Sequence, residues 1–132
     1  MGEANSSIEI LVADSDRQML QLFELVLERE GYQCSFAADS ETVSSVFQTK
    51  LIDLLVLDWF LYWEESEAFA EILPILQRIG VVMCTPRFQL SDDSDDIIPD
   101  FVDRTVVKPF EIKHFLNTIQ SVLEQYGKRV LG

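Results

Sequence analysis

Four polar residues stand directly after apolar runs that predict strands, and together their side chains could handle a phosphoryl group. They are Asp14, Asp58, Thr85 and Lys108. The carboxyl ends of the strands in an open parallel sheet share one crevice, so we expect these side chains to meet. One carboxylate can receive a phosphoryl group, and a second can help to hold a divalent cation. The hydroxyl and the ammonium group can donate to phosphate oxygens.

The strands that must position these residues are short and almost wholly apolar. Strands covered by helices on both faces have this composition. The five predicted strands cover residues 8–13, 32–37, 54–57, 81–84 and 104–107. We expect the third of them, which is the most apolar, to lie at the centre of the sheet.

Apolar residues at three- and four-residue spacing predict helices between the strands. The first helix carries this spacing over residues 19–27 and is stopped by Gly31. Ser15 is its predicted N-cap, because Ser15 and Gln18 fit a capping box. The second helix begins at Asp39 or Ser40 and extends to about residue 48.

The later helices are less regular. Pro74 lacks a backbone donor, which predicts a kink or break near Leu73 in the third helix. A short helix is predicted over residues 89–100, and an apolar stripe over residues 112–126 predicts the last helix.

The alternation of strands and helices predicts an α/β domain whose parallel sheet is covered on both faces. We expect one domain over residues 8–126, a flexible N-terminus over 1–7 and a C-terminal tail over 127–132.

The composition excludes several classes of partner. The net charge is −13, which disfavours binding to the phosphate backbone of nucleic acid. No apolar run is long enough to span a bilayer and no secretory signal begins the chain, so we expect no membrane partner and a cytoplasmic protein. Cys34 and Cys84 lie in apolar runs and are predicted to be reduced core thiols.

Four motifs in order resemble the response-regulator receiver domain of two-component signalling, over about residues 8–126. The motifs are ILVADSD, DLLVLD, VVMCT and VVKPF. The resemblance implies a doubly wound, five-stranded sheet with flavodoxin-like topology. It also implies a signalling phosphoacceptor rather than an enzyme, and a histidine kinase or phosphotransfer protein as the phosphoryl donor. The output would pass to an unknown downstream protein.

The same resemblance assigns a role to each site residue. Asp58 would accept the phosphoryl group, Thr85 would contact a phosphate oxygen, and Lys108 would pair with the carboxylate and the acyl phosphate. Asp14, Asp58 and the backbone carbonyl of Phe60 would hold Mg²⁺. Receivers often dimerise through the surface that corresponds to residues 91–126, which makes a homodimer an expectation.

Three departures from the family pattern affect these roles. Ser15 replaces a second acid that normally binds the metal, which predicts weaker Mg²⁺ binding. Thr105 stands where receivers usually place an aromatic switch residue. The loop expected after Asp58 has the sequence WFLYWEES, and its residues 59–63 predict either a partner-binding patch or a lid over the crevice and the third helix. As a further hypothesis, Phe60 and Trp59 shield an acyl phosphate from water.

Two alternatives to a stand-alone phosphorylated receiver stay open at this point. The first is a pseudo-receiver that binds partners without phosphate. The second is a phosphatase that resembles the haloacid dehalogenases, with Asp14 as the nucleophile and Asp16 as the acid and base. Elsewhere, His114 is interpreted as a solvated surface residue, Asp53 as the end of a loop, and the acids within residues 92–96 as a solvated face.

Overall fold

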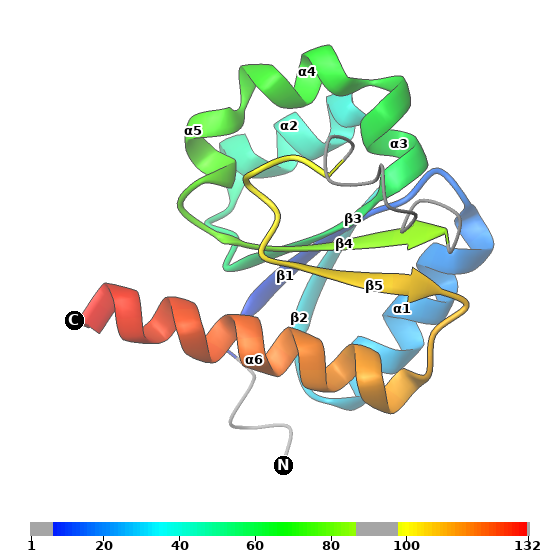
Figure 1. Cartoon of the computed structure of the whole chain (residues 1–132), viewed down its shortest axis with the longest axis vertical. Helices are drawn as coiled ribbons and strands as arrows, with labels where there is room; N and C mark the ends of the chain where they lie inside the picture. The colour runs from blue at the N-terminus through cyan, green and yellow to red at the C-terminus, as the bar shows by residue number, and fades with distance from the viewer. Residues whose placement is uncertain (1–6, 87–97, 132) are drawn as a thin grey trace.

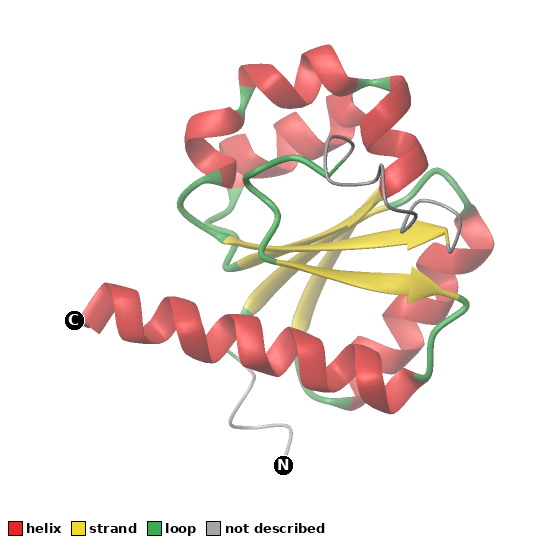
Figure 2. Cartoon of the chain, viewed as in Figure 1, coloured by secondary structure: helices red, strands yellow, loops and turns green. Residues whose placement is uncertain are grey.

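A five-stranded parallel sheet lies between two layers of helices (Figures 1 and 2). The structure is a computed structural model that describes residues 7–86 and 98–131. The strands follow the order β2-β1-β3-β4-β5, which is the flavodoxin-like order of a doubly wound sheet. They are β1 (Glu9–Ala13), β2 (Gln33–Ala37), β3 (Leu54–Asp58), β4 (Gly80–Pro86) and β5 (Arg104–Lys108). The predicted fold and the central place of β3 are confirmed.

Alternation along the strands divides the core into two layers. The face that includes Val12, Val56 and Cys84 packs against α1 and α6. The opposite face, which includes Leu11 and Leu57, packs against α2, α3, α4 and α5. The helices are α1 (Arg17–Arg29), α2 (Ser40–Thr49), α3 (Trp59–Glu64), α4 (Ser66–Glu71), α5 (Leu73–Leu76) and α6 (Ile112–Leu131). Both faces of the sheet are therefore covered, which explains its almost wholly apolar strands.

Several predictions of helix boundaries are confirmed. Asp39 caps α2, and Gly31 follows the C-cap of α1 with a φ of 90°. A break also separates α4 from α5 at Ile72, directly before Leu73 and Pro74. The lost backbone donor of the proline explains this break.

Two predictions about loops were wrong. Ser15 does not cap α1. Asp16 is the N-cap, and its carboxylate accepts a hydrogen bond from the Gln18 N–H. Aspartate and serine are similarly good N-cap residues, because the side-chain oxygen of either can accept a hydrogen bond from an amide of the first turn. The segment after Asp58 is not a loop but the helix α3, and Asp58 is its N-cap.

Three expectations fall at the limits of the described residues. The acids within residues 92–96 lie outside the described residues. So does most of the helix predicted over residues 89–100. The helix α6 continues through Gly127, where a tail was expected, because one glycine costs a helix only about 1 kcal/mol.

The two cysteines are free, with Cys84 buried and Cys34 half-buried. Burial raises the pKa of each thiol to about 12, so both stay protonated and unreactive at neutral pH.

Candidate functional site

Three of the predicted site residues meet at the carboxyl edge of the sheet. Asp14 follows β1, whereas Asp58 and Lys108 are the last residues of β3 and β5. The register pairs Ala13 with Leu57, which brings Asp14 beside Asp58. Strand alternation directs all three side chains toward the α1 and α6 face, because each lies two residues beyond a residue of that layer.

Lys108 joins the two carboxylates. Its Nζ atom lies 2.8 Å from Asp14 Oδ2 and 2.9 Å from Asp58 Oδ1. Only 2% of Asp14 and 4% of Asp58 is exposed, so one partly exposed ammonium group offsets two nearly buried negative charges. We call Asp14, Asp58 and Lys108 the rim triad.

The remaining carboxylate oxygens of the rim triad accept backbone hydrogen bonds. The Asp16 N–H donates to Asp14 Oδ1 over 2.9 Å, and the Leu61 N–H donates to Asp58 Oδ2 over 3.2 Å. Sequence reasoning missed the Leu61 donor. It arises because Asp58 caps α3, and the apolar spacing of Trp59 and Trp63 was the only signal of that helix.

Burial and pairing act in opposite directions on the rim triad. Burial raises the pKa of Asp14 above its usual value, and the hydrogen bond from Lys108 offsets only part of this rise. Burial also opposes the charged form of Lys108, but hydrogen bonds to Asp14 and Asp58 outweigh it and raise the pKa of Lys108. Lys108 is therefore a permanent cation at neutral pH.

Thr85 lies near the rim triad in the sheet, but no hydrogen bond joins it to the three side chains. It follows Cys84, the register partner of Asp58, and alternation places it on the opposite face. Its side chain is fully buried, and Oγ1 has no hydrogen-bond partner among the described residues. Because buried hydroxyls nearly always have partners, this orphan group is available for a ligand oxygen or a water.

The residues present do not form a good Mg²⁺ site. No group of three His, Cys, Asp or Glu side chains converges within residues 7–86 and 98–131. The predicted third ligand, the Phe60 carbonyl, lies inside α3, where carbonyl groups point along the helix axis toward its C-terminal end. That direction leads away from Asp58 at the N-cap. Ser15, at the position of the usual second acid, is exposed.

The aromatic segment after Asp58 has a buried side and an exposed side. Trp59 is buried and stacks on Trp63 with ring centroids 5.4 Å apart. Trp63 is 58% exposed and Phe60 is 45% exposed. The segment can therefore serve as cover and as surface, and an exposed Phe60 is poorly placed to be the main shield of Asp58.

Asp16 does not complete the alternative phosphatase site. It is exposed, and its carboxylate caps α1. Asp14 instead has Lys108 as its side-chain partner. Asp53 lies at the opposite edge of the sheet, where it accepts a hydrogen bond from the Glu9 N–H. His114 is exposed, as predicted.

Known proteins share this arrangement of strands and helices. No family model matches the chain. It is 30% identical over 119 residues to the heme response regulator HssR of Staphylococcus epidermidis, covering 90% of this chain and 53% of that protein. A CheY-like receiver domain protein from Methanospirillum hungatei has a TM-score of 0.79 at 21% identity, covering 92% and 98% of the two chains. NtrX from Brucella abortus has a TM-score of 0.81 at 22% identity, covering 93% of this chain and 28% of that one.

The chain is a response-regulator receiver domain. It spans about half the length of the curated relatives that it matches. Its homologues are response regulators of two-component signalling, a family whose partners are histidine kinases or phosphotransfer proteins. Receiver domains are signalling proteins and generally bind Mg²⁺ through acidic residues.

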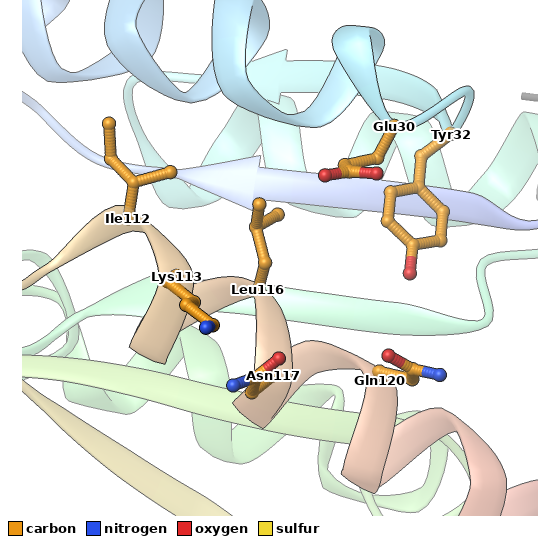
Figure 3. A pocket seen from close by; sticks show the side chains of 7 residues that line it. All are labelled: Glu30, Tyr32, Ile112, Lys113, Leu116, Asn117 and Gln120. Atoms are coloured by element: carbon orange, nitrogen blue, oxygen red, sulfur yellow. The ribbon is translucent and has the colours of Figure 1, made fainter. Parts of the chain in front are cut away.

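Two further structural observations complete the description of this receiver domain. None of its described helices combines the length and the hydropathy that crossing a bilayer requires. A separate hollow of about 540 Å³ lies between the end of α1 and α6, away from the rim triad (Figure 3). Its charged lining groups are Glu30 and Lys113, so it does not repeat the paired carboxylates of the rim.

Proposed function

We propose that this receiver accepts a phosphoryl group on Asp58 from a histidine kinase or a phosphotransfer protein. The proposal rests on one observation, the contact of Lys108 with Asp58 and Asp14 at the carboxyl edge of the sheet. The output would pass by protein contact to a downstream protein or to a second copy of the chain.

The geometry supports a direct displacement at phosphorus. A carboxylate oxygen of Asp58 forms the new P–O bond, and the bond from phosphorus to the donor nitrogen or oxygen breaks, with its electron pair leaving on the donor. Lys108 can follow the charge as it moves onto the phosphoryl oxygens, because an ammonium group on a flexible stem donates in several directions. Thr85 lies on the opposite face of the sheet and is fully buried, so a rearrangement at the end of β4 would have to bring its orphan Oγ1 to one of these oxygens.

A pseudo-receiver is the second candidate, and a specific observation favours it. Each carboxylate oxygen of the rim triad already accepts a hydrogen bond. With only 4% of Asp58 exposed, the site would have to open before a phosphoryl donor could reach it.

Intact-mass measurement after incubation with acetyl phosphate distinguishes the two candidates. We expect wild type to gain the mass of one phosphoryl group and Asp58→Asn to gain none. Asp53→Asn is the matched control, since it removes a carboxylate at the other edge of the sheet, and should gain the group as wild type does. No mass gain in wild type, or an equal gain in Asp58→Asn, would contradict phosphorylation of Asp58.

A further inference from the structure

The rim triad contains its own cation. Lys108 Nζ lies within 2.9 Å of an oxygen of each carboxylate, and 24% of its side chain is exposed. A divalent ion that bound both carboxylates would stand next to this ammonium group. Two positive charges that lie side by side in a partly buried site repel each other strongly.

Lys108 also leaves few protein donors at the rim for Mg²⁺, because it already contacts one oxygen of each carboxylate. Mg²⁺ requires near-octahedral coordination by oxygen. Two carboxylates are the only acidic groups that converge here in the described residues, and the Phe60 carbonyl is directed away along α3. Water would have to supply most of the shell, while one carboxylate oxygen of each Asp stays bound to Lys108.

We propose that the Lys108 ammonium group takes the place of Mg²⁺ in this receiver, so that the Asp14–Asp58 pair is held without a divalent ion. The proposal concerns the same edge of the sheet as the proposed phosphoacceptor but does not depend on Asp58 being phosphorylated. It makes two claims. Wild type has no specific Mg²⁺ site at the rim, and removal of the Lys108 charge creates one.

Urea unfolding in MgCl₂ and in NaCl of equal ionic strength tests both claims. A ligand that binds only the folded state raises the unfolding midpoint, whereas general screening affects both salts equally. We expect the same midpoint in both salts for wild type and a higher midpoint in MgCl₂ for Lys108→Gln. In that variant the affinity for Mg²⁺ should rise about tenfold or more, since a positive charge is lost beside both carboxylates.

Lys50→Gln is the matched control, because Lys50 is exposed and its Nζ contacts Ser35 rather than a carboxylate. It should respond to MgCl₂ as wild type does. Adding Asp14→Asn to Lys108→Gln should abolish the gain, which locates the ion at the rim. A Mg²⁺-specific increase in wild type, or a folded Lys108→Gln protein without one, overturns the proposal.

A second variant keeps the test decisive if Lys108→Gln does not fold. Ser15→Asp retains Lys108 and adds a third carboxylate beside Asp14, while Ser45→Asp adds the same charge to an exposed position on α2. We expect a Mg²⁺-specific increase in Ser15→Asp alone. A Mg²⁺-specific increase in wild type overturns the proposal here as well.

Phosphorylation by acetyl phosphate in MgCl₂ and in EDTA separates this inference from the proposed function. An equal mass gain in both conditions supports both proposals. A gain that requires Mg²⁺ supports phosphorylation and overturns replacement of the metal. With no gain in either condition, phosphorylation is overturned, and the unfolding midpoints still decide the metal question.

Discussion

At the scale of the residue, the rim triad places an unfavourable charge inside the fold. Asp14 is nearly buried, and burial raises its pKa, so the folded protein retains the Asp14 proton to a higher pH than the unfolded chain does. The stability that this group contributes is therefore fully present below the unfolded pKa of about 3.9 and is lost as the pH rises from that value through the folded pKa.

Asp14→Asn should therefore gain stability relative to wild type as the pH rises from about 3 to about 6, because asparagine does not titrate. Urea unfolding of both proteins across this range measures the difference. Asp16→Asn, an exposed change in the same loop, controls for the loss of a carboxylate as such. An advantage for Asp14→Asn that shrinks with rising pH would mean that the folded state lowers the pKa of Asp14.

The contact between Asp14, Asp58 and Lys108 could be predicted from the sequence because strand ends in a parallel sheet share an edge. The environment of Thr85 could not. A single residue of offset places a side chain on the other face of the sheet, and the sequence does not reveal where a strand such as β4 stops.

At the scale of the element, two neighbouring residues at the start of α1 have different roles. The Asp16 carboxylate accepts the Gln18 N–H at 2.9 Å, while the Ser15 side chain caps nothing. Asp16→Ala should lower the free energy of unfolding by about 1 kcal/mol, and Ser15→Ala should change it by no more than about 0.5 kcal/mol. Thermal or urea unfolding of the two variants measures both effects, and a larger loss from Ser15→Ala would restore Ser15 as the cap.

A close approach between β4 and α6 gives a second prediction. A Cβ atom at Gly80 would lie 2.7 Å from Val122 Cγ1 and 3.3 Å from Leu54 Cδ1. Gly80→Ala should cost about 1–3 kcal/mol through overpacking. In a Val122→Ala background the same change should cost less, because the obstructing methyl group is gone. A double-mutant cycle measures the loss in free energy of unfolding in the two backgrounds. Equal losses would show that the contact with Val122 does not restrict which residue fits at position 80.

Strands and helices with a regular pattern of apolar residues are the ones that could be predicted from the sequence. Strands such as β1 and β3 are apolar on both faces, and α1 and α6 carry apolar stripes over several turns, so local pattern and tertiary position agree. The helix α3 was not predicted because six residues give less than two turns of periodicity. Its aromatic residues are equally typical of a binding loop.

At the scale of the whole molecule, the fold separates its charges by depth. The rim triad holds two carboxylates and one ammonium group below the surface, whereas exposed acids contribute to a net charge of −13. Charges that face water are screened by salt, and buried pairs are screened much less. Salt therefore acts mainly on the acidic surface and leaves the triad in place.

Raising NaCl from about 0.02 M to about 0.3 M should therefore increase the free energy of unfolding, since screening relieves repulsion that is stronger in the compact state than in the expanded chain. Replacing exposed Glu24 and Glu71 by Lys makes the net charge less negative by two charges each and should reduce the slope with salt. Urea unfolding at each salt concentration measures both slopes. If salt instead lowered the stability of wild type, screened attractions between exposed charges of opposite sign would outweigh the repulsion among the acids.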